Sequence, residues 1–310
     1  MASFLSEQGR VRAQTSPFRS DCLGGDRPKI ALITGGGSGI CFQIVRQLLL
    51  HGCAGAVICG RRESFLSRAS SSLSSETGKT CLRFACDVRN VSSCEDAIRF
   101  TLERFGSIDI LVNGAAGNFL AEASALSPKG FKTVMEIDAQ GTFNMCRAAH
   151  GALSADGGGV IINISATLQY GATWYQCHAS AAKSAVDSLT RSLALEWGPD
   201  GVRVCGIAPG PIADTPGTTK LAPGLDGEAV DDIVAEGVPL GRMGTAFDIA
   251  MAAVYLCSEG AGSYVTGDVL VVDGGHWLYK PPMVPREMVS ELSRKVEAKS
   301  RNQAPKIVSK

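Results

Sequence analysis

Residues 30–41 limit the possible folds of this chain more than any other stretch, and they read I-A-L-I-T-G-G-G-S-G-I-C. An apolar run at 30–33 meets a glycine cluster at 35–39, and a stretch with apolar residues at helical spacing follows over 40–50. This pattern predicts a buried strand, a tight loop and a helix. Glycines let the backbone approach a phosphate closely, and a helix N-terminus offers unpaired N–H groups and the positive end of its dipole.

A glycine cluster also occurs in plain structural turns, but its place between a strand and a helix favours a dinucleotide site. The residues expected to form this site are Gly35, Gly36, Gly37, Ser38, Gly39 and Ile40.

Strand-like apolar runs alternate with helix-like patterns from residue 29 onward. We expect strands at 30–33, 56–59, 81–86, 108–112, 160–164, 202–207 and 269–272. We expect helices at 40–50, 63–75, 93–105, 131–153, 173–197 and 248–257. Such alternation implies right-handed crossovers and an α/β fold, with a single Rossmann-type doubly wound parallel sheet of about seven strands and helices on both faces. Ligands of such sheets bind beyond the carboxyl ends of the strands.

The chain divides into three parts. Residues 1–28 are polar and lack periodicity, which predicts a flexible arm, and residues 29–276 hold the alternating elements of a dinucleotide-binding catalytic domain. In the basic tail at 277–310, apolar residues at helical spacing predict a short helix. The Gly/Pro/Thr-rich stretch 211–245 is expected to be a mobile segment over the site.

Composition argues against two classes of partner. Thirty basic and thirty acidic residues give a formal net charge of zero, whereas nucleic-acid binding needs a basic face. No stretch approaches the ~18 uninterrupted apolar residues that suggest a membrane span. The eleven cysteines include no C-x-x-C pair, so we expect reduced core thiols and no metal site.

Five motifs lie at or near the ends of the expected strands: T-G-G-G-S-G-I at 34–40, N-G-A-A-G-N at 113–118, I-N-I-S at 162–165, A-P-G-P-I at 208–212, and V-T-G with V-D-G-G within 265–275. With these motifs, the chain resembles the short-chain dehydrogenase/reductase family from about residue 29 to residue 276. Within that family, the segments 115–119, 137–144 and 178–183 resemble the branch of peroxisomal 2,4-dienoyl-CoA reductases.

The resemblance implies an NADPH-dependent reductase that acts on an acyl-CoA thioester in the β-oxidation of unsaturated fatty acids, assembled as a homotetramer. It implies that Asp87 accepts a hydrogen bond from the adenine amine and that Lys183 binds the ribose hydroxyls. The further cofactor contacts implied by the family are Val88, Asn113, Pro209, Gly210 and Ile212.

Three features depart from the family pattern. Cys41 replaces the third glycine of the fingerprint, which normally permits close helix–strand packing, and we expect a slight shift and an intact site. Carbonyl-reducing members carry a tyrosine four residues before Lys183, where this chain has Ala179, and Ala166 occupies the usual serine position. Asp138 stands where family members more often have asparagine.

Tyr175 does not offer a direct replacement for the missing tyrosine. It precedes Lys183 by eight residues, which is roughly 12 Å along a helix at about 1.5 Å per residue. Asp138 is open to two interpretations, a helix-surface carboxylate or a buried functional group, and its apolar neighbours favour the second.

The missing tyrosine favours reduction of a conjugated C=C bond over reduction of a ketone. A ketone oxygen needs a proton at once, which a tyrosine supplies by general acid catalysis. Hydride addition to the δ-carbon of a dienoyl thioester instead spreads charge onto the thioester oxygen, which needs hydrogen-bond donors. We therefore predict that Asp138 and Lys183 are catalytic and direct a water that protonates the α-carbon.

Two alternatives stay open. The chain is a carbonyl reductase of the same fold, acting for example on a 3-oxoacyl thioester, against which Ala179 counts. Otherwise it is a catalytically silent nucleotide-binding protein, against which Lys183 and the intact segment 208–212 count.

The cofactor preference follows from the end of the second expected strand. An NAD site places an acid there for the ribose 2′-hydroxyl, about 20 residues past the glycines, whereas this chain has Arg61 and Arg62 and no acid before Glu63. Two guanidinium groups can hold a 2′-phosphate through forked, charge-assisted hydrogen bonds. We therefore predict NADPH.

The substrate residues and the location are predicted as follows. We expect Arg89 and Lys220 to bind the phosphates of coenzyme A and Phe119 to contact the acyl chain, with surface solvation as the alternative for each. A peroxisomal address ends in S-K-L, and the sequence given ends Ser309-Lys310. Peroxisomal location thus rests on the resemblance, with mitochondrial or cytosolic location as the alternative.

Overall fold

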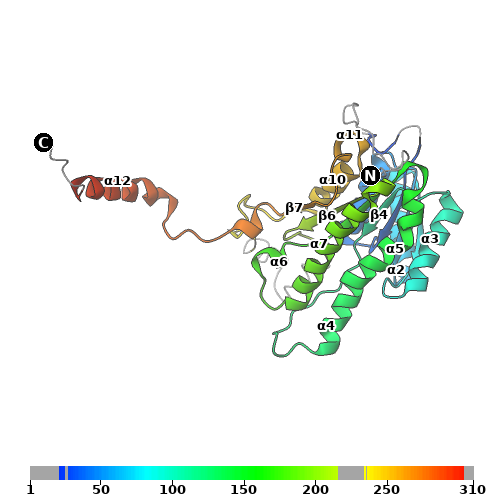
Figure 1. The fold of residues 1–310 in the computed structure, drawn as a ribbon, viewed down its shortest axis with the longest axis horizontal. Helices are drawn as coiled ribbons and strands as arrows, with labels where there is room; N and C mark the ends of the chain where they lie inside the picture. Colours follow the sequence, from blue (N-terminus) through cyan, green and yellow to red (C-terminus); the bar gives the residue numbers. More distant parts are fainter. Residues whose placement is uncertain (1–20, 25–26, 216–233, 235, 304–310) are drawn as a thin grey trace, which may run out of the picture. The chain divides into compact units, whose positions relative to one another are not determined.

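The fold is built on one sheet of seven parallel strands, and the computed structural model describes residues 21–24, 27–215, 234 and 236–303 (Figure 1). The strand order is β3-β2-β1-β4-β5-β6-β7. The strands are β1 (Ile30–Thr34), β2 (Gly55–Gly60), β3 (Thr80–Ala85), β4 (Ile110–Asn113), β5 (Val160–Ile164), β6 (Arg203–Pro209) and β7 (Val269–Val272). The predicted doubly wound α/β architecture is confirmed.

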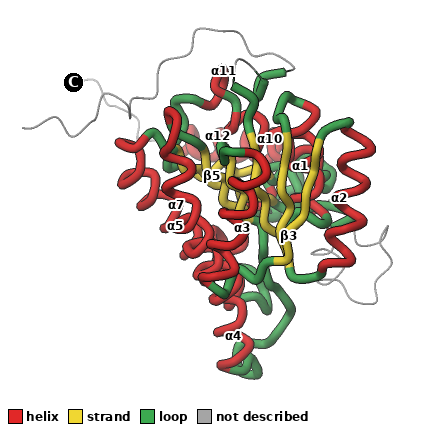
Figure 2. Tube along the Cα trace, turned by 90° about the vertical axis from the view of Figure 1, so that its right-hand side faces the viewer, coloured by secondary structure: helices red, strands yellow, loops and turns green. Residues whose placement is uncertain are grey.

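Helices cover both faces of the sheet. The long ones are α1 (Gly39–Leu50), α2 (Glu63–Thr77), α3 (Val91–Phe105), α5 (Gly141–Ser154), α7 (Cys177–Trp197) and α10 (Ala246–Cys257). Apolar side chains of α1, α2 and α10 pack into one core, and those of α3, α5 and α7 pack into the other. Figure 2 shows α2 on one side of the strands and α5 and α7 on the other.

The remaining helical segments of the described residues are short, except for the last. They are α4 (Pro128–Met135), the π-helical turn η2 (Glu136–Gln140), η3 (Ala155–Gly157), α6 (Leu168–Gly171), η4 (Gly198–Asp200), α11 (Glu259–Gly262), η5 (His276–Leu278) and α12 (Arg286–Gln303).

Two helices differ from the sequence prediction. The helix expected at 131–153 is a run of α4, the π turn η2 and α5, so its register changes partway along. The helix expected from residue 173 begins at Cys177, because Ala172 and Tyr175 adopt positive φ angles of 64° and 61°, which no right-handed helix accommodates.

The end of the expected N-terminal arm is ordered against the domain. Leu23 is fully buried and its N–H donates to the His51 carbonyl at 2.9 Å. Arg27 pairs with the buried carboxylate of Asp109 at 2.5 Å. The prediction of a flexible arm through residue 28 is therefore wrong for these residues, because an apolar side chain and an ion pair fix them. Residues 1–20 and 25–26 lie outside the described part of the chain.

The chain forms two compact units, one ending at Trp277 and one starting at Leu278. The second unit contains α12, which spans the residues whose spacing predicted a helix in the tail.

Candidate active site

The loop after β1 has the geometry of a phosphate-binding turn. Gly35 and Gly39 have positive φ angles of 71° and 55°, which favour glycine. Ser38 is the N-cap of α1, its side chain makes no capping hydrogen bond, and the first turn of the helix holds no acid. The N–H groups and dipole of α1 are therefore directed at the loop without a competing carboxylate, which suits an anion.

Cys41 is accommodated by a glycine on another element. Its thiol is buried, and a Cβ added at Gly114 would lie only 2.0 Å from its sulfur. Thr34 fixes the same loop, because its hydroxyl oxygen accepts hydrogen bonds from the N–H groups of Gly114 (3.0 Å) and Ala115 (3.2 Å). The space left by Gly114 explains how α1 packs on the sheet without the usual third glycine.

The two arginines predicted to bind a 2′-phosphate follow β2 directly and are exposed. Arg62 is the N-cap of α2, and its guanidinium lies 4.5 Å from the centroid of the Phe65 ring. Arg61 acts electrostatically on Asp87, the residue predicted to bind adenine. The arginines and Asp87 thus belong to one region at the carboxyl ends of β2 and β3.

Arg89 also lies in this region at the carboxyl ends of β2 and β3, where it pairs with Asp87. Its Nε donates to the carboxylate of Asp87 at 2.9 Å and its Nη2 at 2.5 Å. The pKa of Asp87 is lowered, first by this hydrogen bond. A neighbouring carboxylate thus holds the Arg89 guanidinium, and its role as a cation for coenzyme A stays a prediction. Lys220 lies outside the described residues.

The other predicted cofactor residues line the same edge of the sheet. The Val88 carbonyl accepts a hydrogen bond from Asn144 at 2.9 Å, and Gly210, just past β6, donates to the Val272 carbonyl at 3.1 Å. Pro209 ends β6, and Ile212 is buried.

The side chain of Asn113 turns into the core, where its amide donates to Asn163 at 2.9 Å. Its contact with the cofactor stays a prediction.

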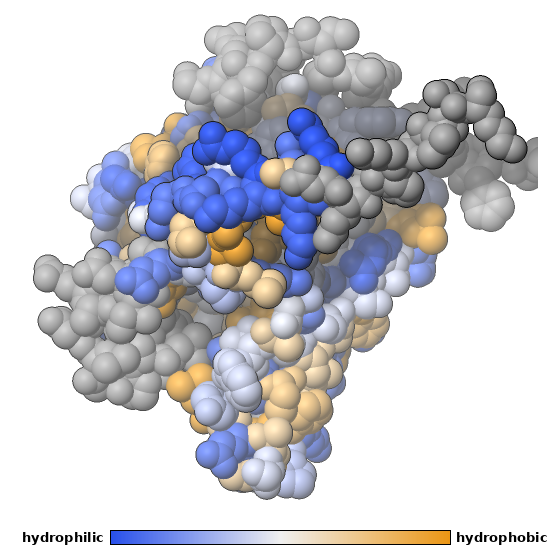
Figure 3. Space-filling model, turned by 90° about the vertical axis from the view of Figure 1, so that its left-hand side faces the viewer, coloured by the Kyte–Doolittle hydropathy of each residue, from blue (hydrophilic) through white to orange (hydrophobic). Residues whose placement is uncertain are grey.

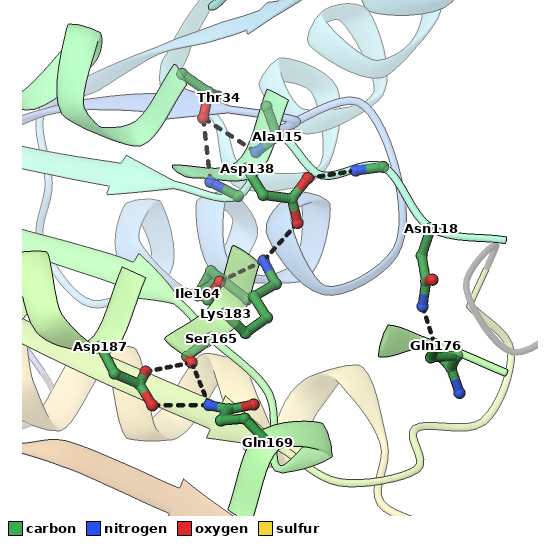
Figure 4. Close-up of polar contacts among 12 residues, drawn as sticks. Thr34, Ala115, Asn118, Asp138, Ile164, Ser165, Gln169, Gln176, Lys183 and Asp187 are labelled. Atoms are coloured by element: carbon green, nitrogen blue, oxygen red, sulfur yellow. Dashed lines mark hydrogen bonds and ion pairs between the residues drawn. The ribbon is translucent and has the colours of Figure 1, made fainter. Parts of the chain in front are cut away.

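Asp138 and Lys183 meet at the centre of this edge (Figure 4). One carboxylate oxygen of Asp138 accepts the Gly117 N–H at 2.7 Å, and the other lies 3.1 Å from the Lys183 Nζ. Lys183 also donates to the Ile164 carbonyl at 3.0 Å. Asp138 is 1% exposed and Lys183 8%, so the pair is buried and stabilised by hydrogen bonds on both partners.

The π-helical turn explains how Asp138 reaches this position. Asp138 lies in the middle of Glu136–Gln140, between α4 and α5. A π turn holds an extra residue within an α-helix and is often found at functional sites. Here it directs a carboxylate toward the sheet edge from a helix that otherwise packs apolar residues.

A second polar cluster lies beside Lys183, and the sequence did not predict it. The Ser165 hydroxyl donates to Asp187, and the Gln169 amide donates to Asp187 at 2.7 Å and to Ser165 at 3.2 Å. Burial and the charge of Asp187 raise the pKa of Tyr170 to about 12. Asp187 follows Lys183 by four residues on α7, and this helical spacing was the signal available in the sequence.

The loop 114–122 is fastened to the start of α7. Asn118 donates to the Gln176 side chain at 2.6 Å, and Ala121 donates to the Tyr175 carbonyl at 2.9 Å. Phe119, predicted to contact the acyl chain, stacks on His178 with ring centroids 4.3 Å apart. Tyr175 is half exposed.

Within the ranges the structure describes, no helix is long and apolar enough to cross a membrane. Over the same ranges, no cluster of three or more His, Cys, Asp or Glu residues could hold a metal ion.

Comparison with known proteins places the chain in a family. The family model described as enoyl-(acyl carrier protein) reductase matches residues 35–276. The chain is 52% identical over 295 residues to the peroxisomal 2,4-dienoyl-CoA reductase [(3E)-enoyl-CoA-producing] of Arabidopsis thaliana, which covers 92% of this chain and 96% of the relative.

Two solved structures share the fold and part of the sequence. A short-chain dehydrogenase from Bacillus anthracis superposes with a TM-score of 0.72 at 36% identity, covering 82% of this chain and 98% of that one. A gluconate 5-dehydrogenase from Burkholderia cenocepacia, in complex with NADP and tartrate, superposes with a TM-score of 0.76 at 30% identity, covering 84% and 99%. The chain therefore belongs to the short-chain dehydrogenase/reductase family, in the group matched by the enoyl-(acyl carrier protein) reductase model.

Proposed function

We propose that this protein reduces 2,4-dienoyl-CoA thioesters with NADPH and yields (3E)-enoyl-CoA, a step in the β-oxidation of unsaturated fatty acids. The observation that carries the proposal is the buried Asp138–Lys183 pair, at a site with alanine at positions 166 and 179. The 52% identity to a reductase of that name over nearly the whole chain supports it. NADPH is the cofactor that the exposed Arg61 and Arg62 suit, because each guanidinium can bind a phosphate.

The chemistry separates a hydride step from a proton step. Bound NADPH supplies the hydride that the δ-carbon of the dienoyl group accepts. The resulting dienolate carries its charge on the thioester oxygen and on the α-carbon, and hydrogen-bond donors stabilise such charge. Protonation at the α-carbon leaves the double bond between carbons 3 and 4, as in a (3E)-enoyl product.

Asp138 and Lys183 direct the proton. The Gly117 N–H and the Lys183 ammonium hold the carboxylate in one orientation, and the Ile164 carbonyl holds the ammonium. A water between this pair and the α-carbon would donate its proton to carbon, and the hydroxide left behind would take a proton from the Lys183 ammonium, which solvent restores. Lys183 also serves the ribose hydroxyls in this proposal, so it couples cofactor binding to proton delivery.

The test is the loss of NADPH absorbance with the purified full-length chain. Samples contain a 2,4-dienoyl-CoA, a 3-oxoacyl-CoA or no second substrate. We expect consumption of NADPH with the dienoyl thioester alone and a (3E)-enoyl product by NMR. Turnover of the 3-oxoacyl thioester in its place would make the chain a carbonyl reductase, and no turnover with either would make it a silent binding protein.

The assembly and location proposed for this chain rest on resemblance. We propose a homotetramer, which would cover apolar side chains such as Phe131 of α4 and Phe143 of α5, which are 39% and 41% exposed. Figure 3 shows pale and orange residues gathered on the lower part of one face, at the height where Figure 1 shows α4. Light scattering tests the mass.

We also propose peroxisomal location, supported by the names of the relatives. A fluorescent fusion that leaves the C-terminus free tests it, and a signal confined to mitochondria or cytosol would contradict it.

A further inference from the structure

The proposed reaction needs a hydrogen-bond donor at the thioester oxygen, and the usual positions do not provide one. Charge develops on this oxygen when the δ-carbon accepts hydride, and removal of a single such donor typically costs ~10²–10³ in kcat. Ala166 and Ala179 stand where other family members carry the serine and the tyrosine, and alanine has no side-chain donor. Another residue must supply this hydrogen bond, and its assignment rests on the proposed function.

Most polar side chains around the Asp138–Lys183 pair already have acceptors. The Lys183 ammonium is bound to the Ile164 carbonyl and to Asp138. The amide groups of Asn118 and Gln169 and the Ser165 hydroxyl each donate to another side chain. A new acceptor would have to break one of these hydrogen bonds.

His178 differs from all of these side chains. It is fully buried, yet neither Nδ1 nor Nε2 forms a hydrogen bond of normal geometry within the described residues, and the polar group that acts on the ring at short range is the Phe119 backbone. A buried polar group without a partner costs roughly 1–3 kcal/mol, so such a group in a native site needs an explanation. His178 lies in the first turn of α7, directly before Ala179, and close enough to Asp138 for that charge to act on its ring.

We propose that the neutral imidazole of His178 donates a hydrogen bond to the thioester oxygen of the bound dienoyl-CoA. One ring nitrogen of a neutral imidazole carries a proton and the other accepts. Such a ring polarises a carbonyl without transferring a full proton, as the neutral catalytic histidine of triosephosphate isomerase does. A dienolate needs this kind of stabilisation, because its proton must go to carbon.

The electrostatics agree with a neutral ring. Burial lowers the pKa of His178 from its usual range, and this effect outweighs a weak hydrogen bond with the Phe119 backbone and the charge of Asp138, which both raise it. The imidazole therefore remains a neutral N–H donor near pH 7, with no proton that it would readily lose to the dienolate.

Phe119 covers the ring and would control access to it. The two rings stack with centroids 4.3 Å apart, and Phe119 is 38% exposed in the loop 114–122. A thioester that enters between the loop and α7 would displace the Phe119 ring and replace its contact with His178. The acyl chain would then lie against Phe119, and the oxygen against an imidazole nitrogen.

The deciding variant is His178→Phe, which keeps an aromatic ring against Phe119 and removes both unpartnered nitrogens. If His178 is only structural, this change should preserve kcat, and it should preserve or raise Tm because two unsatisfied buried atoms are lost. If His178 is the donor, kcat with dienoyl-CoA should fall ~10²–10³-fold while Tm and the Kd for NADPH stay unchanged. His150→Phe is the matched control, because His150 also stacks on an aromatic ring, that of Trp197, at 4.5 Å but lies elsewhere.

A second measurement reads the hydrogen bond without turnover. With NADP⁺ in place of NADPH, the infrared stretch of a ¹³C-labelled thioester carbonyl in bound dienoyl-CoA should lie at lower frequency in the wild type than in His178→Phe. His178→Gln keeps an N–H donor and should show intermediate kcat and frequency, which covers the case of a phenylalanine that is not tolerated.

Wild-type kcat in His178→Phe, or a carbonyl frequency that none of the variants changes, would overturn the assignment while leaving the proposed function intact. An inactive wild type would instead refute the proposed function, and the infrared comparison would still decide whether His178 touches the thioester.

Discussion

The Asp138 side chain is almost fully buried. Its carboxylate forms an ion pair with Lys183 and accepts a hydrogen bond from the Gly117 N–H. A substitution that keeps the shape and removes the charge therefore separates chemistry from packing. We expect Asp138→Asn to lower kcat by about 10²–10⁴-fold, the range of general acid–base assistance, with the Kd for NADPH unchanged in a fluorescence titration.

The matched control is Glu136→Gln in the same π turn, where the side chain pairs with Lys132 at 3.6 Å. It should leave kcat unchanged. Near-normal kcat in Asp138→Asn would show that the carboxylate charge does no chemistry and would leave Asp138 a structural hydrogen-bonding residue.

Arg61 and Arg62 decide the cofactor in our proposal, and replacing each by alanine tests them. A hydrogen bond to a charged group contributes ~1.5–3 kcal/mol, which is about 10–10²-fold in an equilibrium constant. Each variant should lose about this factor in kcat/KM for NADPH and little for NADH.

Arg83→Ala serves as the control, because Arg83 lies on the neighbouring strand β3 and pairs there with Glu63 of α2 at 2.8 Å. Equal kcat/KM values for NADPH and NADH in the wild type would contradict the assignment.

At the scale of elements, the contact between α1 and the loop after β4 depends on Cys41 and Gly114 together. A Cβ at Gly114 would lie 2.0 Å from the Cys41 sulfur. We expect Gly114→Ala to destabilise the protein by about 1–3 kcal/mol through overpacking and Cys41→Gly to relieve most of this loss. Urea unfolding of the two single variants and the double variant measures the coupling.

Gly151→Ala is the control for that cycle, because a Cβ at this position in α5 meets nothing within 4 Å. It should raise stability by roughly 0.5–1 kcal/mol, as expected for glycine in a helix. Additive free energies in the Cys41 and Gly114 cycle would show that the two residues do not share space.

Most helices and strands could be predicted from the sequence, but the detailed contacts of the candidate site could not. Strands such as β5 and β7 were predicted at their observed bounds, because continuous apolar runs in a parallel sheet leave few alternatives. The resemblance to the family, together with the apolar neighbours of Asp138, also made Asp138 and Lys183 candidates, and the structure places them in contact.

Three features could not be predicted, because each depends on backbone geometry or packing that leaves no periodic pattern in the sequence. Phe143 is one of the apolar neighbours that favoured burial of the helix around Asp138, but it is 41% exposed and follows the π turn. Arg89 meets Asp87 through a local turn, and Gly114 makes room for Cys41 from an element far away in the sequence. Neither contact has a periodic signal.

For the whole molecule, the buried core and the candidate site lie within the first compact unit. Every buried apolar side chain of the described residues precedes Leu278, where the second unit begins. We expect a chain that ends after Tyr279 to keep its kcat, and its Tm to shift by less than about 4 °C, the change that ~1 kcal/mol produces in a domain of this size.

Differential scanning calorimetry measures the Tm, and the NADPH assay measures kcat. A larger drop in Tm that depends on protein concentration would show that residues 280–310 contribute to assembly.

The π turn also makes the active site sensitive to the length of the chain. Deleting one residue at Ala139 would let α4 and α5 join as a continuous α-helix, and it would rotate one of them by ~100° relative to the other. In the observed structure α5 packs closely on Val88, because a Cβ at Gly141 would lie only 2.5 Å from the valine side chain. After the deletion, Asp138 could face Lys183 only if α5 lost this contact with Val88. Relatives that gain or lose one residue in this turn should therefore differ in the reaction they catalyse, even where every motif is preserved.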